Sequence, residues 1–124
     1  MSAPEATIVH SFTQAEFDRF ARLSGDDNPI HTDPEFSART HFGRTVAHGL
    51  LLCSLLRGVV DQLIPGGLML EQSVMFPAPT FTDEPMRFHA AITRQEGSAR
   101  ELELSVTRVS DGEVTCQGNC RVTS

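Results

Sequence analysis

A carboxylate and an imidazole lie five residues apart in the segment GDDNPIH, residues 25–31. Together such groups can hold a water molecule and exchange protons near neutral pH. On a helix this spacing would place Asp26 and His31 about 140° apart around the axis. Pro29 lacks an N–H and favours an extended conformation at Asn28. We therefore expect a tight loop that turns both side chains toward one point, with Asn28 bonding backbone groups of the loop.

Two other interpretations of these residues stay open. Asp-Asn-Pro clusters commonly form turns, so Asp26 could cap a turn while Asp27 and His31 face solvent. Metal binding is the other, because several candidate ligands lie in one region: Asp26, His31, Asp33, His41 and His48. Their spacing matches no familiar zinc pattern and no cysteine joins them, so we expect no metal.

The size and charge of the chain exclude several classes of protein. The 124 residues predict a single domain over 1–124, and the net charge is −6 without a single lysine. This balance disfavours nucleic acid and anionic membranes as partners. No targeting segment or run of about 20 apolar residues occurs, so we expect a cytoplasmic protein. We expect free thiols at Cys53, Cys116 and Cys120, the last two being roughly 13 Å apart along one strand.

The first half of the chain predicts helices and a long loop. Residues 11–25, SFTQAEFDRFARLSG, predict an amphipathic helix with Ser11 or Thr13 as its N-cap and Gly25 as its C-cap. An irregular stretch follows to Thr45, with one turn of helix expected at DPEFSART, residues 33–40. Loops of this length in small domains are commonly functional.

The middle of the chain predicts a long buried helix. Within residues 45–67, apolar side chains recur at helical spacing until Pro65-Gly66-Gly67: Leu51, Leu52, Leu55, Leu56, Val59, Val60 and Leu63. They cover so much of the circumference that most of this helix should be buried.

The remaining segments predict strands. Apolar residues alternate at 86–92, 101–106 and 113–122, with hairpin turns at 95–99 and 110–113, and further strands are expected at 6–11 and 68–81, the latter interrupted by Pro77 and Pro79. A long helix with an antiparallel meander predicts an α+β fold whose sheet curls around the helix. One open sheet edge would suit a dimer.

Residues 20–52, FARLSGDDNPIHTDPEFSARTHFGRTVAHGLLL, resemble the hydratase-2 motif of the MaoC-like (R)-specific enoyl-CoA hydratases. The matching features are an aromatic residue, a Ser-Gly-Asp-x-Asn-Pro-aliphatic-His core without a gap, and a later Val-x-His-Gly-aliphatic segment. The resemblance implies that family's hot-dog fold over nearly the whole chain, with an antiparallel sheet wrapped around a long central helix.

The resemblance also implies an activity and roles for matched positions. Water would add to a trans-2-enoyl-CoA thioester to give the (R)-3-hydroxyacyl-CoA, or leave it in the reverse dehydration. Asp26 and His31 would hold the catalytic water, and the Gly49 N–H would stabilise the negative charge on the thioester oxygen. Asp27 occupies the variable place. No cofactor is expected beyond the coenzyme A of the substrate, and a homodimer is expected, with a larger or heteromeric assembly as the alternative.

Arg57 departs from the family pattern, which commonly has serine or a small residue there. It could pair with Asp61 four residues on, or extend to solvent. Alternatively, Arg57 lies at the acyl pocket with Ser54 and binds a carboxylate of a branched dicarboxyl-CoA.

Further candidate contacts and two alternative functions stay open. Met69, Met75, Met86, Phe76, Phe81 and Phe88 could line an acyl tunnel or simply fill the core, and Arg39, Arg44, Arg87 and Arg94 are among the candidates for the CoA phosphates. The alternative functions are a hot-dog acyl-CoA thioesterase and a non-catalytic acyl-CoA-binding subunit of a heteromeric dehydratase.

Overall fold

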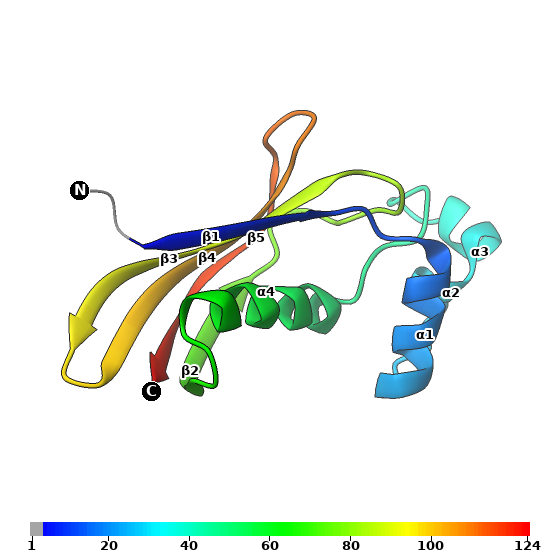
Figure 1. Cartoon of the computed structure of the whole chain (residues 1–124). Helices are drawn as coiled ribbons and strands as arrows, with labels where there is room; N and C mark the ends of the chain where they lie inside the picture. The colour runs from blue at the N-terminus through cyan, green and yellow to red at the C-terminus, as the bar shows by residue number, and fades with distance from the viewer. Residues whose placement is uncertain (1–3) are drawn as a thin grey trace.

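The computed structural model describes residues 4–124 and contains one five-stranded antiparallel sheet with four helices (Figure 1). The sheet has the order β1-β3-β4-β5-β2. Its strands are β1 Glu5–His10, β2 Leu68–Met75, β3 Met86–Glu96, β4 Ala99–Arg108 and β5 Val114–Thr123. The helices are α1 Gln14–Ser24, α2 Pro29–Thr32, α3 Pro34–Ala38 and α4 Gly49–Leu63.

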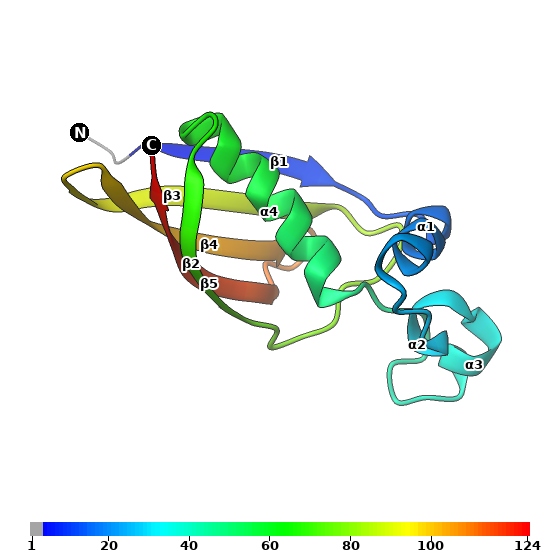
Figure 2. The same ribbon diagram turned by 90° about the horizontal axis from the view of Figure 1, so that it is seen from below.

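The long helix α4 lies across one face of the curved sheet (Figure 2). Its buried residues are Leu51, Leu52, Leu56, Val59 and Val60. They join alternate residues of the strands in one apolar core, among them Met86, Phe88, Leu102, Val106 and Val122. The predicted α+β hot-dog fold, in which the sheet wraps around a long helix, is confirmed.

The helix is buried on the side toward the sheet only. Leu50 is 70% exposed, and Ser54, Gly58 and Asp61 are also exposed in this single chain. The expectation that most of this helix is buried is therefore wrong for the single chain, because the sheet covers one face of α4 and the other face is exposed.

The capped helix α1 begins and ends close to the predicted positions. Thr13, rather than Ser11, is the N-cap, and it forms a capping box with Glu16. Gly25 ends the helix in the left-handed conformation, at φ 81°, and its N–H donates to the Ala21 carbonyl. The helices α1, α2 and α3 gather beyond the N-terminal end of α4 (Figures 1 and 2).

The cysteines are free, as predicted. Burial raises the pKa of Cys116 to about 12 and that of Cys120 to about 11, so both thiols stay protonated at neutral pH. Among the helices of residues 4–124, none has the length and apolar character needed to cross a membrane.

Candidate active site

The backbone around His31 differs from the expected loop in one respect. Asn28 is extended, as predicted, but Pro29 then begins the one-turn helix α2. Proline suits the first helical position because its missing N–H would have no intrahelical partner there. Asn28 is the N-cap, and its side-chain oxygen accepts a hydrogen bond from the Ile30 N–H at 3.1 Å. The predicted bonding of loop backbone by Asn28 is confirmed, and His31 stands on a helical turn.

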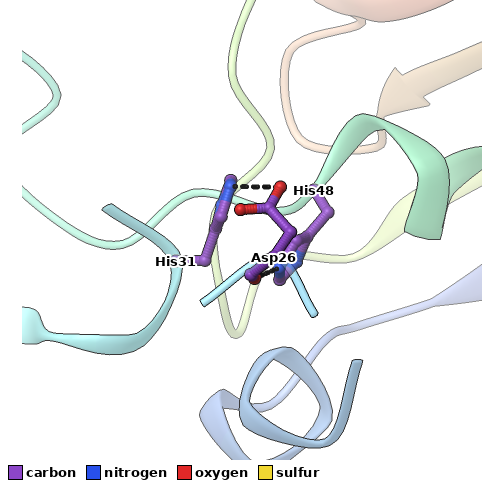
Figure 3. A group of neighbouring side chains, drawn as sticks. All are labelled: Asp26, His31 and His48. Atoms are coloured by element: carbon purple, nitrogen blue, oxygen red, sulfur yellow. Dashed lines mark hydrogen bonds and ion pairs between the residues drawn. The ribbon is translucent and has the colours of Figure 1, made fainter. Parts of the chain in front are cut away.

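The side chains of Asp26 and His31 come together, as the sequence predicted (Figure 3). The distance from His31 Nε2 to Asp26 Oδ2 is 3.7 Å. The imidazole is 10% exposed and the carboxylate 57%. A separation this long leaves room for a water oxygen at about 2.8 Å from both atoms. Asp26 and His31 can therefore bind one small polar molecule between them, beside the edge of the buried imidazole.

The hydrogen bond at the other nitrogen of His31 determines its tautomer. Nδ1 lies 2.7 Å from the Val46 carbonyl oxygen, which can only accept. Nδ1 therefore carries a proton, and in the neutral ring Nε2 holds the lone pair that faces Asp26. His31 can accept or release a proton at Nε2 without breaking its anchor.

His48 completes the cluster, although the sequence indicated it only as a candidate metal ligand and as part of the Val-x-His-Gly segment. Its ring stacks on that of His31, with centroids 3.8 Å apart and planes at 22°. Its Nε2 donates to the backbone carbonyl of Asp26 at 2.9 Å, and the Phe20 ring packs edge-on against it. Burial, and then the proximity of His31, lowers the pKa of His48. The neutral ring thus holds the Asp26 backbone beside His31. The Val-x-His-Gly pattern in the sequence was the signal that could have pointed to it.

Asp26, His31 and His48 lie close enough together for their ligand atoms to be considered as a metal site. Ligand atoms of Asp26, His31 and His48 all lie within 4.8 Å of one another. A histidine binds a metal in the plane of its ring, however, and two nearly parallel stacked rings cannot direct their lone pairs to one point. This geometry disfavours a metal ion, and a metal-free site stays our prediction.

A cavity of about 640 Å³ opens beside His31 and extends to the start of α4. His31 and Gly49 line it, together with apolar side chains that include Phe42, Phe76 and Phe81. The first N–H groups of a helix lack intrahelical acceptors, and the helix dipole favours negative charge there. A Cβ at Gly49 would lie 2.7 Å from the Phe76 ring, so any side chain here would require that ring to move. The cavity therefore has His31 and the start of α4 in its lining together with an apolar wall, while Asp26 lies beside His31 and outside that lining.

The methionine and phenylalanine residues considered for an acyl tunnel divide among the cavity, the core and the surface. Phe76 and Phe81 line the cavity, whereas Met86 and Phe88 are fully buried in the core. Met75 is 58% exposed.

Ser54 and Arg57 do not line this cavity. The Ser54 hydroxyl donates to the Leu50 carbonyl within its own helix, at 3.0 Å. Arg57 Nη2 donates to the Gly67 carbonyl, and Arg57 Nη1 is buried without a partner among residues 4–124. The expected ion pair of Arg57 with Asp61 is wrong, because the Asp61 carboxylate turns to accept the Gly66 N–H. Contacts of Ser54 and Arg57 with a substrate stay predictions.

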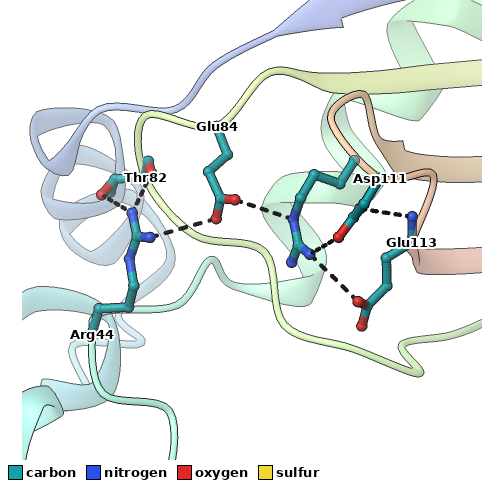
Figure 4. Close-up of polar contacts among 6 residues, drawn as sticks. Arg44, Thr82, Glu84, Asp111 and Glu113 are labelled. Atoms are coloured by element: carbon teal, nitrogen blue, oxygen red, sulfur yellow. Dashed lines mark hydrogen bonds and ion pairs between the residues drawn. The ribbon is translucent and has the colours of Figure 1, made fainter.

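Arg44 supports the cavity wall from outside. Its guanidinium carbon lies 4.7 Å from the centre of the Phe81 ring, and its Nη2 donates to the Thr82 carbonyl at 2.6 Å. Its Nη1 also lies 3.5 Å from Glu84 Oε1 (Figure 4). Arg44 thus connects the loop before α4 to the segment that carries Phe81.

Glu84 extends this contact to the β4–β5 hairpin (Figure 4). Its Oε2 lies 3.2 Å from Arg108 Nε, while Arg108 Nη1 lies 3.0 Å from Asp111 and 3.4 Å from Glu113. Burial alone would lower the pKa of Arg108, but the surrounding carboxylates outweigh it and raise that pKa. The network joins the cavity wall to the sheet.

Comparison with known proteins gives the same family from sequence and from structure. The sequence profile described as MaoC like domain matches residues 2–114. The (R)-specific enoyl-CoA hydratase of Aeromonas caviae is 40% identical over 91 residues, which are 72% of this chain and 68% of that protein. The 3-hydroxybutyryl-CoA dehydratase of Methylorubrum extorquens is 31% identical over 105 residues, 83% and 67% of the two chains. The solved (R)-hydratase from A. caviae involved in PHA biosynthesis superposes with a TM-score of 0.92 and 31% identity, covering 99% of this chain and 96% of that one.

Proposed function

Because this chain belongs to the MaoC-like domain family, we propose that it is a hydro-lyase that hydrates trans-2-enoyl-CoA to (R)-3-hydroxyacyl-CoA, or dehydrates the product. The observation that carries the proposal is the 3.7 Å approach of His31 Nε2 to Asp26 Oδ2, beside a cavity that Gly49 also lines. The (R) configuration rests on the names of the relatives.

Asp26 and His31 share the acid–base work in this proposal. They hold a water whose oxygen attacks the β-carbon of the enoyl thioester, while one of them accepts the proton that the water loses. A proton then reaches the α-carbon, so that water has added across the double bond. Because the two groups lie close together, a proton can pass between them and restore the starting state.

Gly49 supplies the electrostatic part of the proposed reaction. Attack at the β-carbon places negative charge on the thioester oxygen before the α-carbon is protonated. The N–H of Gly49, at the start of α4, can donate to that oxygen, and the helix dipole adds to the effect. The missing side chain lets the thioester approach the backbone closely.

Arg57 is a candidate for selecting the acyl group. Its buried Nη1 has no partner among residues 4–124, so a dicarboxyl acyl chain that extends beyond the cavity to this side of α4 would meet an unpaired donor for its carboxylate. Under this proposal, wild-type protein prefers a dicarboxyl enoyl-CoA over crotonyl-CoA, and Arg57→Leu removes the preference. Equal rates on both substrates in the wild type would exclude this role.

We infer that the active form is a homodimer in the cytoplasm. Apolar side chains are exposed on the edge strand β2, just after it and on the open face of α4: Leu68, Leu70, Met75, Phe76 and Leu50. A second copy at this edge would cover them, and it would also cover the cavity wall at Phe76.

The test is the loss of conjugated-thioester absorbance when purified protein meets crotonyl-CoA. Wild type should consume the substrate, and Asp26→Asn and His31→Ala should each lower kcat by about 10²-fold or more, as expected for general acid–base groups. A thiol-reactive dye run in parallel distinguishes hydration from thioester hydrolysis, because only hydrolysis releases coenzyme A. Thiol release, or activity that survives both substitutions, would contradict the proposal.

A further inference from the structure

The side-chain amide of Gln14 joins three parts of the chain around the candidate site. Its Nε2 donates to the backbone carbonyl of His31 at 2.8 Å and to Asp18 Oδ1 at 3.1 Å. Its Oε1 accepts a hydrogen bond from the Thr45 hydroxyl at 2.7 Å. A carbonyl and a carboxylate can only accept, so these partners determine which way the amide faces. Both N–H groups and the oxygen of Gln14 are therefore in use.

The contact to His31 matters because α2 is a single turn. Carbonyls near the end of a helix have no intrahelical donors. The Ile30 carbonyl instead accepts the Val46 N–H at 2.9 Å, and the His31 carbonyl accepts Gln14 Nε2. Donors from elsewhere in the chain, one of them on α1, therefore hold the backbone of His31.

Thr45 closes a ring of contacts around the imidazole. It is buried, 4% exposed, and directly precedes Val46, whose carbonyl accepts the His31 Nδ1–H at 2.7 Å. The ring runs from Gln14 to the His31 backbone, through the imidazole to Val46, and through Thr45 back to Gln14. A shift of Gln14 thus changes the position of the His31 backbone relative to the carbonyl that anchors its ring.

We propose that Gln14 and Thr45 are positioning residues that hold His31 Nε2 toward Asp26. The inference rests on the proposed function of the Asp26–His31 pair. Neither Gln14 nor Thr45 lines the cavity, so both act through His31 rather than on the substrate. A catalytic group displaced by about 1 Å can lose as much as 10²-fold in rate, so such support affects turnover more than substrate binding.

Steady-state kinetics on crotonyl-CoA test the proposal. Gln14→Glu retains the shape of the side chain but replaces both N–H donors with an acceptor that faces the His31 carbonyl. We expect kcat to fall by about 10-fold or more while KM stays within about twofold. Thr45→Val, which removes the hydroxyl, should act in the same direction, and Thr45→Ser should restore wild-type kcat. Because the two residues share one hydrogen bond, the double variant should be no slower than the slower single variant.

Two controls separate positioning from general destabilisation. Gln95→Glu makes the same chemical change at an exposed position of β3 and should leave kcat unchanged. Thermal unfolding of each variant is measured in parallel, and Gln14→Met replaces Gln14→Glu if the latter does not fold. A lower Tm with kcat within twofold of wild type in both Gln14 and Thr45 variants would overturn the proposal.

An NMR measurement separates failure of this inference from failure of the proposed function. In ¹⁵N-histidine-labelled wild type, neutral His31 should be protonated at Nδ1 alone, and Gln14→Glu should shift its ring signals toward a mixture of tautomers. Inactive wild type would contradict the proposed function but leave this measurement valid. Unchanged His31 signals in Gln14→Glu would contradict the positioning role.

Discussion

At the scale of single residues, the candidate site depends on backbone groups as much as on side chains. The Val46 carbonyl selects the tautomer of His31, and the Asp26 carbonyl binds His48. Gly49 contributes only its backbone. The orientations of His31 and His48 are therefore determined by main chain elsewhere in the sequence, whereas the Asp26 carboxylate accepts the N–H of Asn28, two residues on.

Gly49 gives the sharpest prediction at this scale. In Gly49→Ala the new methyl group would meet the Phe76 ring, initially at 2.7 Å, and would extend into the space proposed for the thioester. Phe76 is 46% exposed, so its ring can move and stability should change little. We expect kcat/KM on crotonyl-CoA to fall by about 10²-fold, as for loss of an oxyanion donor, with Tm nearly unchanged.

The matched control for this substitution is the double variant Gly49→Ala/Phe76→Leu. The leucine relieves contact with the ring but cannot restore approach of the thioester to the backbone, so activity should stay low. Recovery of activity in the double variant would instead assign the loss to the clash with Phe76.

At the scale of elements, α1 connects the sheet to the catalytic segment. His10, at the end of β1, lies 2.7 Å from Glu16, which also belongs to the capping box of the helix. Burial alone would raise the pKa of Glu16, but hydrogen bonds from His10 and Thr13 outweigh it and lower that pKa. Gln14 on the same helix reaches His31, so a well-fixed α1 is part of the site's support.

The lowered pKa of Glu16 predicts a pH-dependent contribution to stability. A carboxylate whose pKa is lower in the folded state stabilises the protein above its unfolded pKa, about 4.3, and this stabilisation is lost as the pH falls through the lower folded value. Glu16→Gln can keep the capping box, so it removes mainly the charge. We expect Tm measured at pH 7 to be lower than in wild type, by the equivalent of about 0.5 kcal/mol for a partly exposed pair.

The difference in Tm between wild type and Glu16→Gln should shrink in scans at pH 4 and below. Gln95→Glu, the control variant of the kinetic experiment, adds a carboxylate at an exposed position of β3 and so gives the opposite charge change. A gap in Tm that stays constant from pH 7 to pH 3.5 would show that the charge of Glu16 contributes nothing.

At the scale of the whole molecule, the two edges of the sheet differ in character. The edge strand β2 and the residue after it expose several apolar side chains, whereas β1 exposes chiefly Glu5, Thr7 and Val9. The open face of α4 carries the exposed Leu50. These features favour association of two copies through β2 rather than through β1.

This asymmetry predicts different effects of one charge placed on either edge. Met75→Glu, on β2, should convert a protein with twice the 13.6 kDa chain mass into a monomer, with loss of crotonyl-CoA hydration. Val9→Glu, on β1, makes the same kind of change at a position of similar exposure, 57% against 58%, and should leave the dimer intact. Sedimentation of both variants distinguishes a dimer seam at β2 from one at β1. A monomeric Val9→Glu with a dimeric Met75→Glu would place the seam at β1.

Much of the fold was predictable because its signals are local. The Ser-Phe-Thr segment and Gly25 marked the two ends of α1, and apolar residues at helical spacing located α4. The alternation of apolar and polar residues located the strands on either side of Gly97 and Gly112. The spacing of Asp26 and His31 likewise predicted a convergent pair, since few residues separate them. The one-turn helix α2 was not predicted, because Pro29 both ends the extended segment and begins the next helix. The strand expected over 68–81 ends at Met75, before the two prolines.

Neighbouring residues were enough to predict the main helices and strands, the α+β class and the pair at the centre of the candidate site, but not the one-turn helix α2. The stacking of His48 on His31, the bridge from Gln14 to Thr45 and the turn of Arg57 toward Gly67 were decided by tertiary structure alone. Each joins residues from different elements, and neither spacing nor residue type specifies which polar groups meet when those elements pack. Burial favours such contacts, because a polar group removed from water without a partner costs free energy.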